Sequence, residues 1–189
     1  TVGGNLCLDT RCLFYNQSEW WRASNQYCLK YRGDICHVAP RGKRCFAVFS
    51  GDLAPALLVH GATVTVAGPA GERAMPLPDL YRGDGADYLT LKPGEIVTAV
   101  TLAGGGVASA YRKARIRGAI DFPLAGIAVA LRAEGGAVTA LRAALTAGDT
   151  RPCLVSGLEN FTGRALDEDT ARAFGEAVQR QARPMQTTT

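Results

Sequence analysis

The sequence predicts an α+β protein in two parts. Short runs of alternating β-branched residues, such as residues 63–67, indicate strands in both halves of the chain. Apolar segments at 53–59 and 167–181 indicate one helix in each half. The three consecutive glycines at 104–106 are the best candidate for a hinge, which divides the chain into parts 1–104 and 105–189.

The elements of the first part follow from local patterns. Residues 20–23 are expected to form a short helical turn. The apolar run at 53–59 is predicted to be a helix that starts at Asp52 and is ended by Gly61. Strands are predicted at 63–67, 73–77 and 96–102, and the Gly-Pro-Ala-Gly sequence at 68–71 indicates the turn between the first two.

The second part is predicted to contain three strands and two helices. The strands are expected at 108–115, 124–132 and 138–144, with a hairpin turn at Glu134-Gly135-Gly136. Residues 152–159 and 167–181 are predicted to be helical. In the second of these, Ala171, Phe174, Ala177 and Val178 share one face, and Asp167 is the candidate N-cap.

Composition narrows the class of protein. The 189 residues are 47% hydrophobic and 20% charged, which is typical of a globular protein. No run of eighteen apolar residues occurs, so no membrane span is predicted. The net charge of +4 is concentrated in one stretch and nearly cancels elsewhere, which does not favour nucleic-acid binding. No export signal is visible, so a cytoplasmic, reducing location is expected.

The unusual stretch contains four cysteines, Cys12, Cys28, Cys36 and Cys45. It also holds eight of the chain's fourteen aromatic residues, and between 11 and 44 it has seven Lys or Arg residues against two Asp or Glu. Aromatic side chains exclude water from a buried cluster, and basic residues offset the negative charge of thiolate ligands. We interpret this stretch as a loop wrapped around an iron–sulfur cluster.

The cysteine spacing leaves other interpretations open. Structural zinc sites usually pair their ligands as C-x₂₋₄-C, whereas the closest pair here is separated by seven residues. The spacing also departs from the compact run of small ferredoxins. Disulfides or buried free thiols are the remaining alternatives. His37 is either a further ligand or, more simply, a surface residue, and Cys7 and Cys153 are expected near the glycine turn and in the core.

The chain contains a series of sequence blocks in a recognisable order. They are Thr-Val-Gly-Gly-Asn at 1–5, Gly-Asp-Leu-Ala-Pro-Ala-Leu-Leu at 51–58, Gly-Glu-Arg at 71–73, Pro-Gly-Glu-Ile-Val at 93–97 and Ala-Tyr-Arg-Lys at 110–113. Together they resemble the FAD-binding subunits of the molybdenum hydroxylases, such as xanthine dehydrogenase and carbon monoxide dehydrogenase. The roughly forty residues inserted between the first two blocks, which contain the cysteines, resemble the branch formed by the β subunits of 4-hydroxybenzoyl-CoA reductases.

The resemblance implies a specific fold. Residues 1–104 would be the second subdomain of a PCMH-type FAD-binding domain, with a [4Fe–4S] loop inserted at about 11–49. Residues 105–189 would be the family's small C-terminal domain, an α/β plait with a three-stranded antiparallel sheet plus helices. The family's N-terminal FAD half-site is not in this sequence, so we expect a fragment that binds FAD poorly by itself.

The resemblance also implies a function. The enzyme would be a dimer of heterotrimers in which this subunit is joined by a molybdenum-cofactor subunit and a [2Fe–2S] subunit. Electrons from reduced ferredoxin would pass through [4Fe–4S] and FAD towards [2Fe–2S] and molybdenum. The reaction would be the reductive dehydroxylation of 4-hydroxybenzoyl-CoA to benzoyl-CoA in anaerobic aromatic degradation, with no catalytic residue on this chain. The alternatives are a zinc-stabilised, non-redox interaction module and the FAD subunit of another molybdenum hydroxylase.

Residue roles follow from the matched blocks. The turn formed by Thr1, Val2, Gly3, Gly4 and Asn5 would lie against FAD with its amides exposed. Asp52 would accept a hydrogen bond from the cofactor, although a helix N-cap is a compatible alternative. Val97 would contact the flavin, and Lys113 or Arg112 would supply a cation, unless Lys113 is a solvated strand charge. Cys12, Cys28, Cys36 and Cys45 would bind the cluster.

The basic residues of the inserted loop suggest one further hypothesis. Arg41, Lys43 and Arg44 would form a docking surface for acidic ferredoxin, because complementary charge steers association. The alternative is that these charges only offset the charge of the cluster.

Overall fold

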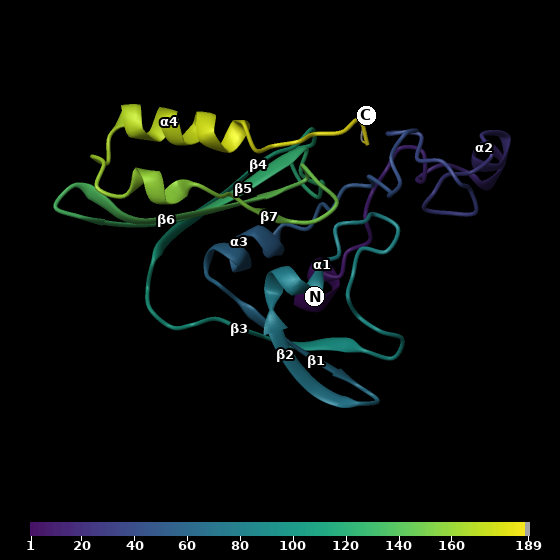
Figure 1. Ribbon diagram of the computed structural model, residues 1–189, viewed down its shortest axis with the longest axis horizontal. Coiled ribbons are helices and arrows are strands. Elements are labelled where there is room, and N and C mark those ends of the chain that lie inside the picture. The colour runs from purple at the N-terminus through teal and green to yellow at the C-terminus, as the bar shows by residue number, and fades with distance from the viewer. Residues whose placement is uncertain (188–189) are drawn as a thin grey trace.

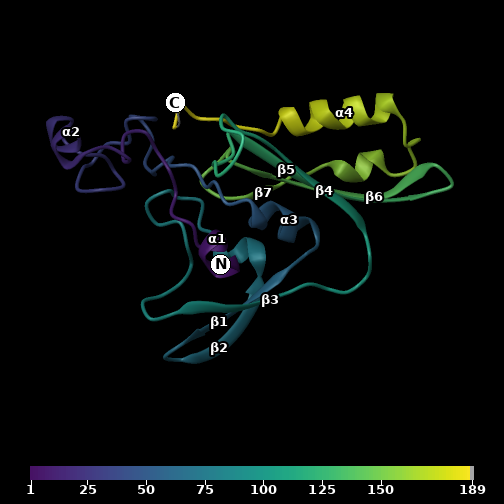
Figure 2. The ribbon, with the colours of Figure 1, turned by 180° about the vertical axis from the view of Figure 1, so that it is seen from behind.

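Residues 1–187 of the computed structural model form two antiparallel sheets with helix α3 (Leu53–Val59) between them (Figure 1). The first sheet has the strand order β2-β1-β3 and the second has the order β4-β5-β6-β7. Leu58 of α3 belongs to a single buried cluster that contains Val64 of the first sheet and Ala128 and Ala144 of the second. The two predicted parts of the chain therefore share one hydrophobic core. The view from behind also shows α3 between the two sheets (Figure 2).

The first sheet follows the predicted strands closely. Strands β1 (Thr63–Gly68) and β2 (Gly71–Pro76) form a hairpin, and β3 (Ile96–Thr101) pairs with the other edge of β1. Val64 and Val66 alternate into the core and are fully buried. A bulge leaves Thr98 as the extra residue of β3, so the strand is irregular next to Val97. The 3₁₀ helix η1 (Leu77–Leu80) follows β2.

The second sheet has one strand more than predicted. Strands β4 (Ala108–Ala114), β5 (Ala125–Glu134) and β6 (Ala137–Thr146) match the prediction, and the short β7 (Cys153–Leu154) pairs with β6. The predicted helix at 152–159 is therefore wrong. The segment gives β7 and then the 3₁₀ helix η2 (Leu158–Phe161), because Gly157 adopts a positive φ of 73° and so interrupts a helical backbone.

The last helix was predicted correctly. Helix α4 (Glu168–Gln179) begins at the N-cap Asp167, whose Oδ1 accepts a hydrogen bond from the Thr170 amide at 2.8 Å. Its apolar face packs on η2, where the Phe174 and Phe161 rings meet edge to face. The glycines at 104–106 lie in the connection between β3 and β4, and their role as a hinge stays a prediction.

The N-terminal segment differs from the expected glycine turn. Residues Val2–Leu6 form helix α1, because the Thr1 side chain accepts a hydrogen bond from the Gly4 amide and so caps the helix. Because this cap stabilises a helix, the segment does not form the turn that its two consecutive glycines suggested. Leu6 is completely buried in the core.

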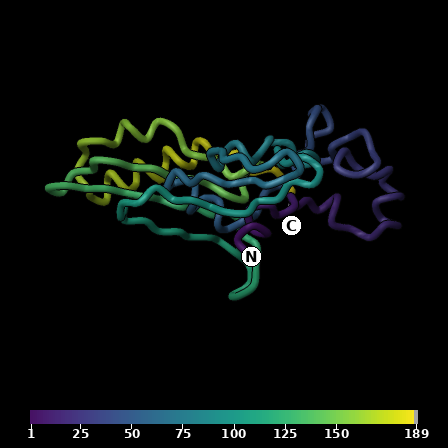
Figure 3. Tube along the Cα trace, turned by 90° about the horizontal axis from the view of Figure 1, so that it is seen from below, coloured from purple at the N-terminus to yellow at the C-terminus, as the bar shows by residue number. Residues whose placement is uncertain are grey.

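The cysteine stretch is a closed loop that projects from one end of the molecule (Figure 3). At its base, Arg11 and Val48 exchange both backbone hydrogen bonds, each 2.7 Å long. Near its tip lies helix α2 (Glu19–Ser24), capped by Ser18, where a helical turn was predicted. The paired base means that the insertion enters and leaves the body of the protein at one point.

Candidate functional site

The chain before α3 passes very close to α1. A Cβ atom on Gly51 would lie 2.7 Å from the Asn5 carbonyl oxygen and 2.6 Å from the Phe49 ring, so only glycine fits this crossing. The Asn5 side chain accepts a hydrogen bond from the Leu53 amide at 2.9 Å. The first and second blocks of the sequence are therefore held together, although 45 residues separate Asn5 from Gly51.

Asp52 bonds to the second sheet rather than to its own helix. Its Oδ1 accepts a hydrogen bond from the Tyr111 hydroxyl at 2.6 Å, and its Oδ2 lies 2.7 Å from the Lys113 ammonium. Asp52 occupies the N-cap position of α3, as predicted, but its side chain makes no capping hydrogen bond, because its αR backbone lacks the extended conformation that capping requires. Asn5 supplies the acceptor in its place. Burial and the Asp52 hydrogen bond raise the pKa of Tyr111.

Side chains of strand β4 alternate between its two faces, and this alternation favours Lys113 over Arg112 as the predicted cation of the site. Tyr111 and Lys113 face inward and are partly buried, whereas Arg112 faces solvent. The Lys113 ammonium also donates to the backbone oxygen of Asp121 at 2.9 Å. A solvated strand charge is therefore the wrong interpretation of Lys113, since it is an ion-paired group that ties β4 to α3 and to the following loop.

Val97 and α1 lie next to each other. A Cβ atom on Gly3 would lie 3.8 Å from the Val97 carbonyl oxygen. The expected row of free amides is shorter than predicted, because Gly4 and Asn5 donate to the side chain and carbonyl of Thr1 within the helix. The structure thus brings α1, Asp52, Val97 and Lys113 into one region, with the amides of Val2 and Gly3 at its edge.

The four cysteines of the insertion are all buried. Their exposed fractions are 6% for Cys12, 7% for Cys28, 5% for Cys36 and 4% for Cys45. All are free thiols in the part of the chain that the structure describes. Cys12 and Cys45 belong to one apolar cluster with Ala47, flanked by Phe14, Tyr15, Leu29 and Val38.

Burial is the largest influence on the pKa of two of these thiols. Burial raises the pKa of Cys12, and the charges of Cys28 and Cys36 raise it further. Burial raises the pKa of Cys45 to about 11, and the charges of Cys36 and Cys12 act in the same direction. At the same time, no three His, Cys, Asp or Glu side chains among residues 1–187 lie close enough to hold a single metal ion.

Cys45 is held by the loop at 82–88. Its amide donates to Asp84 at 3.2 Å, its carbonyl oxygen accepts from the Gly85 amide at 2.9 Å, and its sulfur accepts from the Ala47 amide at 3.3 Å. A Cβ atom on Gly85 would lie 2.7 Å from the Ala47 nitrogen, so this contact also requires glycine. The cysteine loop is thereby fastened to the body beyond its base.

The remaining cysteines and histidines lie outside this group. Cys7 follows α1 and is half-buried, as the predicted place near the glycines suggested, and Cys153 is also half-buried rather than fully in the core. His37 is not a free surface residue, because its ring packs against Phe14 with centroids 5.1 Å apart. His60 ends α3 and contacts the Ser109 hydroxyl at 3.1 Å.

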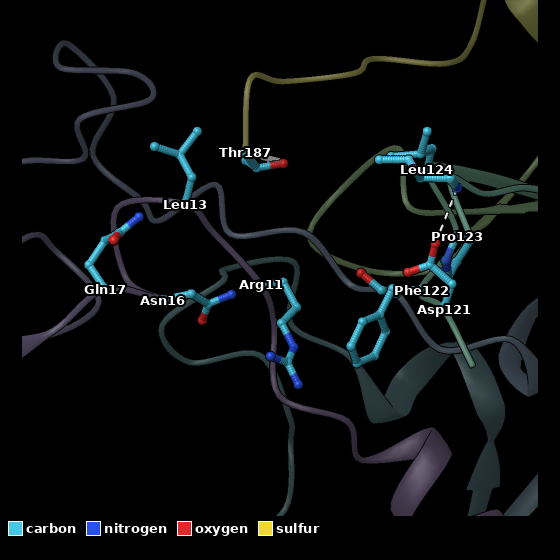
Figure 4. Close-up of a pocket in the computed structure, with 11 residues that line it drawn as sticks. Arg11, Leu13, Asn16, Gln17, Asp121, Phe122, Pro123, Leu124 and Thr187 are labelled. Carbon is cyan, nitrogen blue, oxygen red and sulfur yellow. Dashed lines mark hydrogen bonds between the residues drawn. The ribbon is translucent and has the colours of Figure 1, made fainter. Parts of the chain in front are cut away.

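A pocket of about 300 Å³ lies between the start of the cysteine loop and the loop at 115–124 (Figure 4). The Arg11 guanidinium lies 4.5 Å from the centroid of the Phe122 ring. The Arg11 Nε is buried and has no hydrogen-bond partner among the described residues. Asp121, whose backbone oxygen binds Lys113, lines the same pocket. The pocket therefore lies between the region around Lys113 and Arg11, the residue that precedes Cys12.

Sequence reasoning missed Tyr111 as a partner of Asp52, the Arg11–Phe122 contact and the role of Lys30 described below. Tyr111 lies within a recognised block, and its spacing of two residues from Lys113 on a predicted strand could have indicated the shared face. The other two depend on contacts between segments far apart in the chain, for which the sequence has no local signal.

Comparison with known proteins identifies the family. A model of the family described as the FAD binding domain in molybdopterin dehydrogenase matches residues 1–102, more than half of the chain. The chain belongs to this family. Its fold class, a mixed α and β structure with antiparallel sheets, agrees with that of the family, as predicted.

Solved structures of the family have the same fold. CO dehydrogenase from Oligotropha carboxidovorans is 26% identical with a TM-score of 0.62, over 71% of this chain and 47% of that chain. Quinoline 2-oxidoreductase from Pseudomonas putida 86 is 25% identical with a TM-score of 0.61, over 80% of this chain and 54% of that chain. The chain spans about half the length of these structures.

Two further expectations can be compared with these findings. The resemblance to the molybdenum hydroxylase flavoproteins is confirmed at the level of the family. No helix within residues 1–187 is both long enough and apolar enough to cross a bilayer.

Proposed function

We propose that this chain is part of the electron-transfer flavoprotein subunit of a molybdenum-containing oxidoreductase, with a [4Fe–4S] cluster in the cysteine loop. The observation that carries the proposal is the position of that loop. Four buried thiols lie in an insertion closed at its base by Arg11 and Val48, and the insertion separates the two blocks that meet at Gly51. The loop is thereby attached directly to the region assigned to the flavin.

The residues around Asp52 suit FAD. The Val2 and Gly3 amides provide donors at the start of α1, where phosphate oxygens are favoured. Lys113 provides a cation whose charge Asp52 partly balances. Val2 and Ile96 expose 51% and 63% of their surface beside this region, and exposed apolar groups of this kind are typical of binding surfaces. Bound FAD would supply the redox chemistry of the domain, and these side chains would position it.

The cysteine loop suits a cluster. Cys12, Cys28, Cys36 and Cys45 are free and buried. Phe14 and Tyr15 pack against the cluster of Cys12 and Cys45, and the Ala47 amide donates to the Cys45 sulfur. Hydrogen bonds to sulfur and exclusion of water are the means by which proteins tune iron–sulfur potentials. A bound cluster would relay single electrons.

The spacing of the four cysteines in the sequence favours the cluster over zinc, because no two of them form the C-x₂₋₄-C pair that structural zinc sites usually contain. One tetrahedral zinc ion would require the sulfurs to lie roughly 3.8 Å apart, given Zn–S bonds of about 2.3 Å. A four-iron cluster spreads its ligands further, since each thiolate binds a different iron. Widely spaced cysteines, such as Cys28 and Cys36, suit this wider arrangement when the loop folds over the cluster.

The inserted loop also supports a particular reaction, the reductive dehydroxylation of 4-hydroxybenzoyl-CoA. Two electrons and two protons would convert this substrate to benzoyl-CoA and water. Electrons from reduced ferredoxin would enter at the cluster and pass through FAD to a [2Fe–2S] subunit and a molybdenum subunit, which would hold the substrate. The assembly would be a cytoplasmic dimer of heterotrimers. The solved relatives of the family include carbon monoxide and quinoline oxidoreductases, so the FAD subunit of another molybdenum hydroxylase is the second candidate.

The charges available for ferredoxin are fewer than the sequence suggested. Arg41 and Lys43 are exposed on the loop. Arg44, in contrast, donates to the Gly83 carbonyl oxygen and lies 3.8 Å from Asp149, so it fastens the loop to the body. The proposed docking surface therefore consists of Arg41 and Lys43 without Arg44.

The test is the metal content of the complete subunit, purified without oxygen. We expect about four iron and four sulfide per chain, bound FAD, and a reduced-cluster EPR signal after dithionite. One zinc and no iron would overturn the cluster and the ferredoxin inlet, while bound FAD would leave the flavoprotein assignment in place. Neither iron nor zinc, with FAD present, would support the second candidate.

A further inference from the structure

Lys30 carries a charge that is buried between the cysteine loop and the body of the protein. Its side chain is only 5% exposed. The ammonium donates to Asp9 Oδ1 at 2.8 Å, to the Thr10 hydroxyl at 2.7 Å and to the Gly85 carbonyl oxygen at 2.6 Å. All three donor positions of the ammonium are therefore used, and all three partners lie outside the inserted loop that contains Lys30.

Aromatic rings flank the Lys30 ammonium. The ammonium lies 5.0 Å from the centroid of the Tyr15 ring and 5.3 Å from that of Tyr88, within the range of cation–π attraction. Asp9 is the one carboxylate among its ion-pair partners in the described chain, and half of that side chain faces solvent. Solvent weakens the neutralising effect of Asp9, so much of the positive charge of Lys30 remains effective on the buried side.

The buried side of Lys30 faces the cysteines. Gly85 accepts from Lys30 through its oxygen and donates through its amide to Cys45, so one residue connects the ammonium to a thiol-bearing residue. The ammonium is therefore one residue away from the backbone of a proposed cluster ligand. Lys30 also follows Cys28 by two residues in the same loop.

We propose that Lys30 is the positively charged group of the cysteine site. Its ammonium fastens the loop to the body and raises the reduction potential of the proposed cluster. This inference rests on the proposed cluster. One-electron reduction by ferredoxin or dithionite adds one negative charge at the cysteines. A fixed positive charge in a water-poor environment stabilises that added charge, and net charge is one of the determinants of iron–sulfur potentials. Lys30 is a positioning and tuning residue rather than a catalytic one.

The test compares variants of opposite sign in the complete subunit. Lys30→Met removes the cation and keeps the length of the side chain, whereas Asp9→Asn removes the anion that partly neutralises it. We expect the cluster potential to fall in the first variant and to rise in the second. The expected change is about tenfold in the ratio of reduced to oxidised cluster at a fixed ambient potential, or about 59 mV for one electron. Lys92→Met, which alters an exposed lysine outside the loop, is the control and should leave the potential nearly unchanged.

The measurement is a redox titration followed by EPR, with iron counted in every sample. Opposite shifts in Lys30→Met and Asp9→Asn would support the inference. If both variants retained four iron but kept the wild-type potential, or shifted in the same direction, the inference would be overturned. If Lys30→Met lost its iron, the direction of the shift in Asp9→Asn would decide. Absence of iron from the wild-type subunit would instead refute the proposed function, which separates the two failures.

Discussion

The Lys113 ammonium lies 2.7 Å from Asp52 Oδ2, and this ion pair joins the first part of the chain to the second. The Tyr111 hydroxyl binds the other oxygen of the same carboxylate at 2.6 Å. Lys113 is 18% exposed and Asp52 is 36% exposed, so the pair is partly shielded from solvent. It fixes α3, which carries Asp52, against β4 within the region assigned to the flavin.

Breaking this ion pair should weaken both stability and flavin binding. We expect Lys113→Met to lower the free energy of unfolding by about 1 kcal/mol, because a partly exposed pair contributes modestly and Asp52 keeps its Tyr111 bond. In the complete subunit the variant should also retain less FAD. Urea unfolding and the flavin-to-protein ratio measure the two effects. Arg112→Met, which alters the adjacent solvent-facing cation, should change neither, and an equal effect of both variants would contradict the assignment of Lys113.

Two glycines should respond to alanine with opposite signs. Gly51→Ala would place a methyl group within 2.7 Å of the Asn5 oxygen, and we expect a loss of about 1–3 kcal/mol through overpacking. Gly175 lies on the exposed face of α4 with no atom near its missing Cβ, so Gly175→Ala should gain about 1 kcal/mol from helix propensity. Urea unfolding compares the two. An unchanged midpoint for Gly51→Ala would show that α1 and α3 do not approach as described.

Loss of one cluster ligand should spare the flavin. In the complete subunit, we expect Cys28→Ala to lose the cluster iron and its EPR signal while FAD remains, because Cys28 lies in the projecting loop and the proposed flavin contacts lie at α1, α3 and β4. Cys153→Ala, which alters a half-buried cysteine of the second sheet, should keep four iron. Iron that survived Cys28→Ala, or was lost from Cys153→Ala, would show that the ligand set is wrong.

Charge reversal on the loop should slow electron entry. Replacing Arg41 and Lys43 by Glu should lower the rate of reduction by ferredoxin at low salt, and the difference from wild type should shrink as salt screens the charges. Stopped-flow absorbance measures this rate. The control is Arg172→Glu on α4, which reverses an exposed charge remote from the loop. Equal rates for the loop variant and wild type at low salt would refute docking at this surface.

Much of the fold could be predicted from local patterns. The strands of the first sheet have alternating β-branched residues, and α4 has both a helical apolar face and an Asp cap, so local sequence and final structure agree. Local prediction failed where contacts at a distance or a single backbone angle decided the outcome. Within the predicted helix at 152–159, Cys153 and Leu154 form β7 because the edge of β6 was available to pair with them. Asp52 precedes a helix and yet bonds to β4.

The sequence by itself determined the family, because the family is encoded in short blocks with a fixed order, and the same blocks predict the residues near the flavin. Only the tertiary structure decided which Lys and Arg side chains face solvent and which are held by hydrogen bonds. Arg44 and Lys30 look like the other cations of the loop, but Arg44 binds Gly83 and Lys30 binds Asp9, Thr10 and Gly85. The reason is physical: a lysine or arginine charge takes its role from the oxygens that surround it after folding, and those oxygens come from segments distant in sequence.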